Sequence, residues 1–200
     1  MFFHVRRLKA LFLILMSMLT LSSCSMKEAL SNRQKERPVL VVAGVVHVCP
    51  ENKIAIIERG KYPYGKAMFG GHVEYESPQV AFVREIGEEL SISKIDTLQL
   101  IGIHGEPGRD PRQHSVEATF SCTTSQKPVA GSDAKEVFLY SVNDLNGKID
   151  KMIFAADHKE ILKNYLQDLK SCNPCQKTCK VGIPQYIPSL LGMPSDLPSN

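Results

Sequence analysis

Three carboxylates stand close together in the sequence, at positions 85, 88 and 89. On a helix, these offsets place Glu85, Glu88 and Glu89 on one face. Like charges at this spacing repel each other, so folding alone gives no reason to cluster them. Mg²⁺ offsets the repulsion, because it prefers carboxylate and water oxygens and accepts phosphate oxygens as further ligands. The spacing is compatible with a magnesium site for a phosphate-containing ligand, but three acids alone more often form a solvated acidic helix face.

The segment that carries these acids has the signals of a helix start. Ser77 is a good N-cap, and Pro78 suits the first helical position. We therefore predict a helix over residues 78–90. Arg84 lies four residues before Glu88, and it either orients a carboxylate or binds Glu76 at the helix start. The face expected to be buried consists of Val80, Val83, Ile86 and Leu90.

The surrounding chain predicts a sheet with helices. Residues 40–48 are β-branched and apolar on both faces, which indicates a central strand. Further strands are expected at 54–58, 98–104, 115–123 and 136–142, and a second amphipathic helix at 157–169. Strands with one helix between them and one behind indicate an α+β domain over residues 38–170.

The residues around the acids continue a longer pattern. Gly70 is followed by Glu76, by the Arg84-Glu85 pair and by the Glu88-Glu89 pair, with aliphatic residues at 86 and 92. This spacing resembles the Nudix box of the Nudix hydrolases at nearly every fixed position. Ser91 departs from it, because the family has a helix-ending Gly there. A left-handed Ser should cost about 1 kcal/mol.

The resemblance implies a fold, a cofactor and a reaction. The fold would be an α/β/α sandwich with a central mixed β-sheet. Mg²⁺, with Mn²⁺ as the alternative, would be held by Gly70 and the three carboxylates, and Arg84 would belong to the catalytic set. The reaction would be hydrolysis of a diphosphate linked to another moiety. One residue is missing between Tyr75 and Glu76 relative to the usual box.

Four shorter segments indicate which group of Nudix hydrolases the chain resembles. Residues 62–65 (YPYG), 107–114 (PGRDPRQH), 130–134 (AGSDA) and 154–158 (FAADH) are similar to segments of bacterial and archaeal ADP-ribose pyrophosphatases. Phe69 differs, since the family usually has Pro there. The resemblance implies that the small-molecule nucleotide substrate is ADP-ribose, cleaved to AMP and ribose 5-phosphate.

Several other residues are candidates for substrate contact or proton transfer. Arg59 and Arg109 could hold phosphate or ribose oxygens, although a loop Arg is more often solvated. In this family a loop acid often assists the attacking water, and Asp133 and Glu136 are the candidates. The alternative roles are about as frequent: Asp133 would then be a turn residue, and Glu136 a charged residue at the edge of a strand. His114 and His158 are more often packed or capping residues than ligands.

Two other functions remain open. Related enzymes hydrolyse modified nucleoside triphosphates. Bacterial regulators that resemble this chain around residues 108–111 use a non-catalytic Nudix module to sense a ligand, and they carry a DNA-binding winged helix after it. The thirty residues after position 170 are too few and too proline-rich for such a helix.

The first 24 residues have the pattern of a targeting signal. Residues 6–9 (RRLK) form a short basic stretch, residues 11–21 are apolar except for Ser17 and Thr20, and residues 21–24 (LSSC) resemble the lipobox of bacterial lipoproteins. The apolar run is shorter than the roughly 20 residues that span a bilayer. We expect a signal peptide at 1–23, a lipid on Cys24, a tether at 24–37 and attachment to the envelope membrane. A start at Met26 would instead make the protein cytoplasmic.

Composition excludes some classes of partner. The net charge of +3 comes from Arg6, Arg7 and Lys9, and the chain has no Trp and 7% aromatics. The rest of the chain has no net charge and few aromatic side chains, so it lacks the basic surface and the stacking platform of a general nucleic-acid-binding protein. A homodimer is common among similar pyrophosphatases.

The remaining cysteines leave their chemistry open. In the Cys/Pro-rich tail (171–200), the residues Cys172, Cys175 and Cys179 are compatible with a disulfide or with a weak zinc site. Cys49 and Cys122 are expected to be small apolar residues.

Overall fold

The computed structural model describes residues 37–131, 134–169, 172–176, 179 and 182–184. The predicted signal peptide, Cys24, Met26, most of the tether and Asp133 lie outside the described residues. Within the described ranges, no helix is long and apolar enough to cross a membrane.

One mixed sheet organises the chain. Its path runs β3-β2-β1-β6-β5-β8, with β4 also paired to β1 and β7 to β2. Among the strand pairs of the described residues, β1 and β6 pair in parallel and the others are antiparallel. The strands are β1 (Val39–Val48), β2 (Lys53–Arg59), β3 (Lys66–Ala67), β4 (Phe69–His72), β5 (Thr97–His104), β6 (Ser115–Thr124), β7 (Ala134–Ser141) and β8 (Ile183–Pro184).

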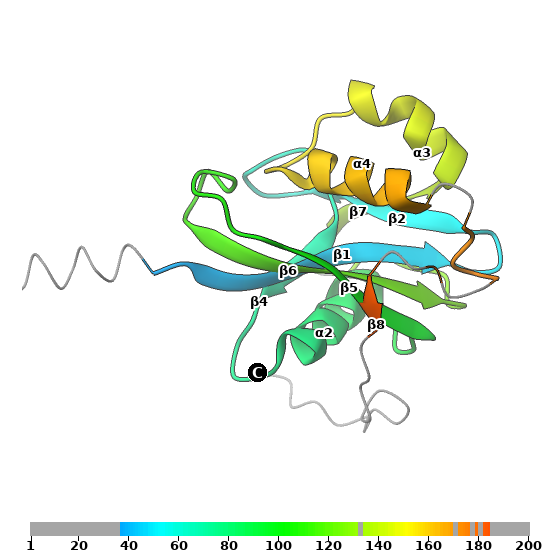
Figure 1. Ribbon diagram of the computed structural model, residues 1–200, viewed down its shortest axis with the longest axis horizontal. Helices are drawn as coiled ribbons and strands as arrows, with labels where there is room; N and C mark the ends of the chain where they lie inside the picture. Colours follow the sequence, from blue (N-terminus) through cyan, green and yellow to red (C-terminus); the bar gives the residue numbers. More distant parts are fainter. Residues whose placement is uncertain (1–36, 132–133, 170–171, 177–178, 180–181, 185–200) are drawn as a thin grey trace, which may run out of the picture. The chain divides into compact units, whose positions relative to one another are not determined.

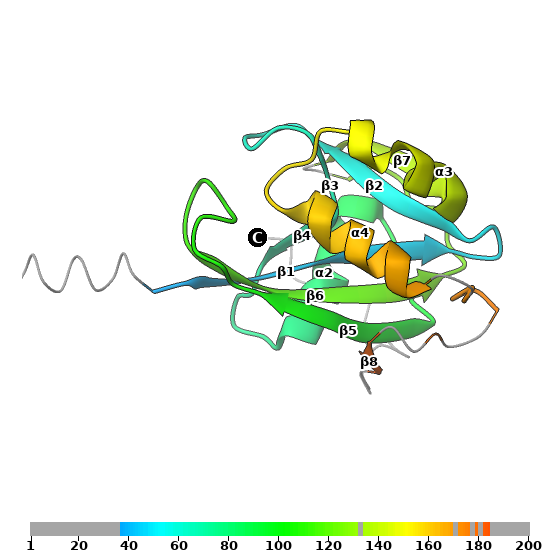
Figure 2. The same cartoon turned by 45° about the horizontal axis from the view of Figure 1, so that its top comes forward.

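Helices cover both faces of this sheet. Helix α2 (Pro78–Leu90) lies on one face, and α3 (Val142–Lys148) and α4 (His158–Leu169) lie on the other (Figures 1 and 2). Strand β1 alternates between the two cores: Val42 and Val46 pack in the core under α2, while Ala43 and Val45 pack in the other. This explains why the strand is apolar on both faces. The predicted α+β fold, an α/β/α sandwich with a central mixed sheet, is confirmed.

Helix α2 begins and ends where the sequence predicts. The Ser77 hydroxyl accepts a hydrogen bond from the Val80 amide at 3.4 Å. Ser91 ends the helix with φ 54° and ψ 33°, the left-handed conformation in which Gly is favoured. One expected core residue is wrong: Val80 is 40% exposed, whereas Ala81 and Phe82 are fully buried. The apolar stripe is therefore centred nearer to Phe82 than predicted.

Helix α3 is absent from the sequence-based prediction. The strand expected to reach residue 142 ends at Ser141. The Ser141 hydroxyl accepts a hydrogen bond from the backbone N–H of Asp144 at 3.1 Å and so caps the seven-residue helix that follows. Asn143, Asp144, Asn146 and Gly147 all have low helix propensity, so the segment reads as a loop. The short 3₁₀ helix η1 (Ile149–Lys151) follows it.

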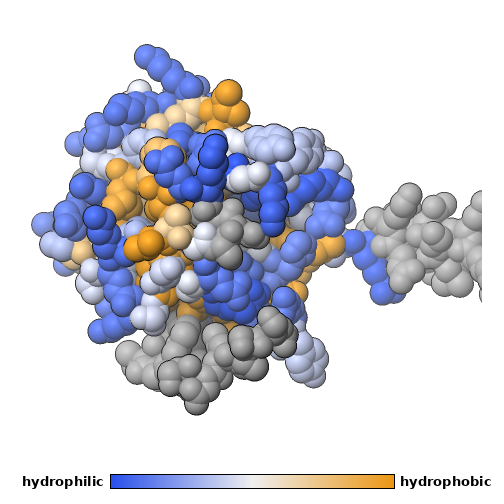
Figure 3. All heavy atoms as spheres, turned by 180° about the vertical axis from the view of Figure 1, so that it is seen from behind, coloured by the Kyte–Doolittle hydropathy of each residue, from blue (hydrophilic) through white to orange (hydrophobic). Residues whose placement is uncertain are grey.

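One disulfide joins the start of the tail to the domain, and a second closes a short loop within the tail. Cys49 pairs with Cys175, and Cys172 pairs with Cys179. The expectation that Cys49 is simply a small apolar residue is therefore wrong, whereas Cys122 is buried and carries no disulfide, as expected of a small apolar residue. Strand β8 then pairs with β5. The back of the molecule shows apolar areas among hydrophilic residues (Figure 3).

Candidate active site

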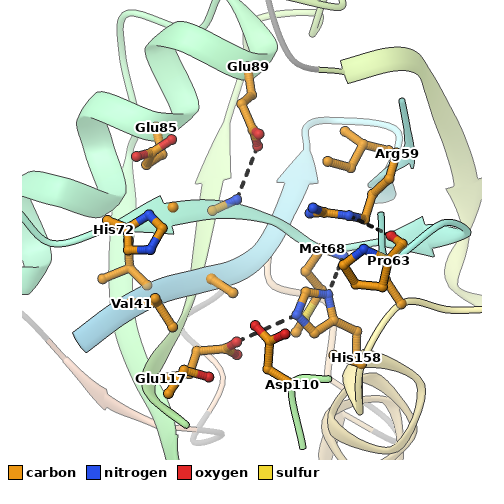
Figure 4. Close-up of a pocket in the computed structure, with 18 of the residues that line it drawn as sticks. Val41, Arg59, Pro63, Met68, His72, Glu85, Glu89, Asp110, Glu117 and His158 are labelled. Carbon is orange, nitrogen blue, oxygen red and sulfur yellow. Dashed lines mark hydrogen bonds and ion pairs between the residues drawn. The ribbon is translucent and has the colours of Figure 1, made fainter. Parts of the chain in front are cut away.

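A cavity of about 400 Å³ lies where α2 meets strands β1, β2, β4 and β6 and the loops that include residues 60–63, 109–112 and 155–156. Glu85 and Glu89 approach it from α2 on one side, and Asp110, Glu117 and His158 lie on the other (Figure 4). The α2 carboxylates and the ionisable side chains opposite them therefore face one space that is large enough for a small ligand.

The three predicted carboxylates share the α2 wall of the cavity. Glu85 and Glu89 are buried, at 9% and 8% exposure, whereas the side chain of Glu88 is 53% exposed. The Glu89 carboxylate accepts the backbone N–H of Gly70 at 3.0 Å. A Cβ atom on Gly71 would overlap the carboxylate of Glu85. The glycine pair therefore lets β4 approach the acidic face of the helix closely.

Arg84 organises these acids. Its Nη1 atom donates to Glu85 at 2.8 Å and to Glu88 at 3.3 Å, and its Nη2 atom donates to Glu76 at 2.8 Å. The predicted contact with Glu76 is confirmed. Burial raises the pKa of Glu85 although Arg84 lowers it, and the charges of Glu88 and Glu76 raise it further. The acidic wall therefore still favours additional positive charge.

The donor set suits a hard divalent cation. It combines carboxylate oxygens of Glu85, Glu88 and Glu89 with the backbone of Gly70, and all four residues line the cavity. Among the described residues, no three His, Cys, Asp or Glu side chains converge closely enough to form a ligand cluster. Arg84 bonds Glu85 and Glu88 from one nitrogen and so lies between them. The chemistry of the donors fits, and ligation requires these side chains to reorient.

A buried ionic network forms the opposite wall. Arg109 donates to Asp157 at 2.6 and 2.9 Å, to Glu117 at 3.0 Å and to Ser115 at 3.3 Å. Its side chain is 4% exposed. The guanidinium that the sequence suggests for substrate binding therefore borders the cavity but is engaged within the protein.

His158 belongs to the same network. Its Nδ1 atom accepts a hydrogen bond from the backbone N–H of Met68 at 3.1 Å, and its Nε2 atom lies 3.5 Å from the Oε2 atom of Glu117. A neutral ring in this arrangement carries its proton on Nε2, toward Glu117. Burial raises the pKa of Glu117, but His158, Arg109 and Thr119 together lower it to about 2. Glu117 is thus a fixed negative charge at the cavity wall.

Other predicted residues are more dispersed. Arg59 lines the cavity, and its Nε atom donates to the Pro63 carbonyl at 2.8 Å. Glu136 is exposed on β7, opposite Glu58 of β2, and is not among the cavity-lining residues. Asp133 falls in the undescribed segment. His114 bonds the Gly105 carbonyl at 3.0 Å, a packing role.

The structure adds residues that the sequence reasoning missed. Glu117 lies in the cavity wall, and a single acid within the otherwise uncharged strand β6 was the available signal. Asp110 and Arg112 form a pair with contacts of 2.8 and 3.0 Å beside the cavity. The motif at 107–114 pointed to this loop, but of its residues only Arg109 and His114 were considered, and Asp110 and Arg112 were not.

The protein belongs to the Nudix family. A family model for the NUDIX domain matches residues 38–165. An ADP-ribose pyrophosphatase from Methanocaldococcus jannaschii is 36% identical over 135 residues, which cover 65% of this chain and 74% of the relative. The expectation of a Nudix pyrophosphohydrolase is thereby confirmed.

Solved structures share the fold at low identity. The Nudix domain of NrtR from Shewanella oneidensis, complexed with ADP ribose, has a TM-score of 0.59 and 19% identity over 72% of this chain and 97% of that domain. A bifunctional NMN adenylyltransferase/ADP ribose pyrophosphatase from Francisella tularensis, complexed with AMP and a Mn ion, has a TM-score of 0.55 and 22% identity. That match covers 66% of this chain and 42% of the Francisella chain. At these identities the likeness concerns the fold alone.

Proposed function

We propose that the protein is a Mg²⁺-dependent hydrolase of nucleoside diphosphate derivatives, with ADP-ribose, cleaved to AMP and ribose 5-phosphate, as the preferred substrate. The observation that carries this proposal is the acidic wall, where Glu85, Glu88 and Glu89 face one cavity beside Gly70. The name of the Methanocaldococcus relative and the ADP-ribose bound by the Shewanella domain support the choice of substrate.

Each residue has a distinct task in this proposal. Glu85, Glu88 and Glu89, with Gly70, would hold the cation, and Mn²⁺ is the alternative metal. When bound, the cation supplies Lewis-acid chemistry and neutralises charge on the diphosphate oxygens. Arg84 would orient the carboxylates. Water attacks one phosphorus, the bridging P–O bond breaks, and two phosphomonoesters leave. Asp133 and Glu136 stay predictions for the group that takes the proton.

A panel of nucleotides tests the substrate. We would measure phosphate-coupled turnover with Mg²⁺ on ADP-ribose, NADH, dinucleoside polyphosphates and normal or oxidised triphosphates. Preference for ADP-ribose with AMP as product supports the proposal. Preference for a triphosphate keeps the metal chemistry but overturns the substrate. Binding of ADP-ribose without turnover, by folded protein with Mg²⁺, would instead make the chain a ligand sensor.

We also propose that the enzyme acts in the cell envelope. Under this proposal, residues 1–23 are a signal peptide, Cys24 carries the lipid, and residues 24–37 tether the domain at 38–170. The Cys49–Cys175 and Cys172–Cys179 pairs support it, because disulfides persist in oxidising compartments and are rare in the cytosol. The expected homodimer remains a prediction, for which sedimentation of the purified protein is the test.

Fractionation tests the location. Cys24→Ala should move the protein from the membrane to the soluble fraction, while Cys122→Ala, at a buried cysteine without a disulfide, should leave it at the membrane. Wild-type protein found in the cytosol, with its thiols open to alkylation, would favour translation from Met26.

A further inference from the structure

The cavity has an acidic wall, but a diphosphate ligand also needs cationic partners. Two arginines at its border are occupied by the protein itself. Arg84 bonds the α2 carboxylates, and Arg109 is enclosed by Asp157 and Glu117. Neither guanidinium can bind a ligand without giving up buried ionic contacts, which is costly.

Arg112 also lines the cavity, and its situation is different. Its side chain is 42% exposed. Asp110 holds one edge of the guanidinium, accepting Nε at 3.0 Å and Nη2 at 2.8 Å. Asp110 is itself 8% exposed and also accepts the backbone N–H of Arg112 at 2.9 Å. The pair is therefore anchored at its buried, acidic end.

The second edge of the same guanidinium is available to a ligand. Arginine has five N–H donors in two forks, and Asp110 uses only the fork made by Nε and Nη2. No other side chain in the described ranges accepts a hydrogen bond from Arg112. A fixed, charged and half-exposed fork matches the geometry of phosphate oxygens.

The position of Arg112 places it near the acidic wall. The adjacent residue, Gln113, lies against β4, with its Nε2 atom 3.3 Å from Nε2 of His72. The His72 carbonyl in turn accepts Nη2 of Arg84 at 2.9 Å. The loop that carries Arg112 therefore meets the strand that contacts the α2 carboxylates.

We infer that Arg112 binds an anionic oxygen of the substrate's diphosphate, and that Asp110 is the positioning residue that orients it. The inference rests on the proposed function for the identity of the substrate. It assigns to Arg112 the ligand contact that sequence reasoning suggested for Arg109. A contact made equally in the ground state and the transition state should act on KM more than on kcat.

The test uses charge-removing and charge-keeping variants. Arg112→Gln should raise KM for ADP-ribose by about 10- to 100-fold, the range of a lost charge-assisted hydrogen bond, and change kcat by less than about threefold. Arg112→Lys should recover only part of the affinity, because an ammonium cannot form the fork. Asp110→Asn should raise KM less than Arg112→Gln. Lys148→Gln, at an exposed residue of α3 outside the cavity, is the matched control.

Direct binding separates this inference from the proposed function. By calorimetry, Arg112→Gln should weaken ADP and ADP-ribose but leave the affinity for adenosine, which lacks phosphate, unchanged. Wild-type binding that depends on Arg112, without turnover of any compound, would support the inference and overturn the hydrolase. Unchanged KM and Kd in a folded Arg112→Gln variant, or failure of the wild type to bind either phosphate-containing probe, would overturn the inference.

Discussion

Arg84 and Glu76 are joined by two hydrogen bonds, from Nε at 3.0 Å and from Nη2 at 2.8 Å to the same carboxylate oxygen. Both side chains are 17% exposed. The remaining nitrogen of Arg84, Nη1, bonds Glu85 and Glu88. Glu76 therefore fixes one side of the Arg84 guanidinium, and the other side of the guanidinium positions the carboxylates of Glu85 and Glu88.

This relationship predicts the effect of Glu76→Gln. An amide oxygen can still accept from Arg84, but the loss of charge leaves the guanidinium paired more strongly with Glu85 and Glu88. We expect kcat to fall by about tenfold, as for other groups that orient metal ligands, and more Mg²⁺ to be needed for half-maximal rate. A Mg²⁺ titration of the rate measures both effects. Glu160→Gln, at an exposed acid on α4, is the control; equal Mg²⁺ curves for the two variants would contradict the role of Glu76.

Ser91→Gly should stabilise the protein. Ser91 has φ 54°, which glycine adopts without the steric penalty of a Cβ atom. We expect the free energy of unfolding in urea to rise by about 1 kcal/mol, with turnover unchanged. Ser91→Ala keeps the Cβ atom and is the matched comparison. If the glycine variant is no more stable than the alanine variant, the cap is not strained.

The two disulfides should differ in their contribution to stability. Cys49 and Cys175 are 126 residues apart, whereas Cys172 and Cys179 are 7 apart. In the chain-entropy account, the longer loop stabilises by about 5 kcal/mol and the shorter by about 2 kcal/mol. Denaturant unfolding of the two double Cys→Ser variants measures the difference. Equal losses, or intact thiols in the oxidised wild type, would argue against this pairing.

Local signals in the sequence predicted the part of the fold that carries the acids. Ser77 and Pro78 mark the helix start, and the box spacing identifies Glu85, Glu88 and Glu89. What the sequence could not supply were long-range partners. The Cys49–Cys175 bridge and the Arg109–Asp157 ion pair join residues 126 and 48 positions apart, and no local pattern encodes them. Helix α3 was missed because its residues favour loops and only tertiary packing, with Leu145 fully buried, makes it a helix.

Acid should weaken the protein through Glu117. Its pKa is about 2 in the folded state against 4.5 as the ordinary value, because Arg109, His158 and Thr119 bind the carboxylate. A lowered pKa stabilises the fold at pH values above 4.5, by about 3 kcal/mol, and this is lost as the pH falls from 4.5 towards 2.

Urea unfolding between pH 6 and pH 3 tests this effect. The wild type should lose more stability over that range than Glu117→Gln, which cannot titrate at this position. Parallel pH profiles for the two proteins would show that Glu117 is not held as a charged group.

The most direct test of the account is the turnover of ADP-ribose by Glu89→Gln at saturating Mg²⁺. The amide oxygen of Gln can still accept the Gly70 N–H, so the melting temperature should match that of the wild type. If the α2 carboxylates hold the catalytic cation, kcat should fall by at least about 100-fold, while Glu160→Gln retains full activity. A folded Glu89→Gln enzyme with kcat within about threefold of wild type would contradict the assignment of the acidic wall as the catalytic centre.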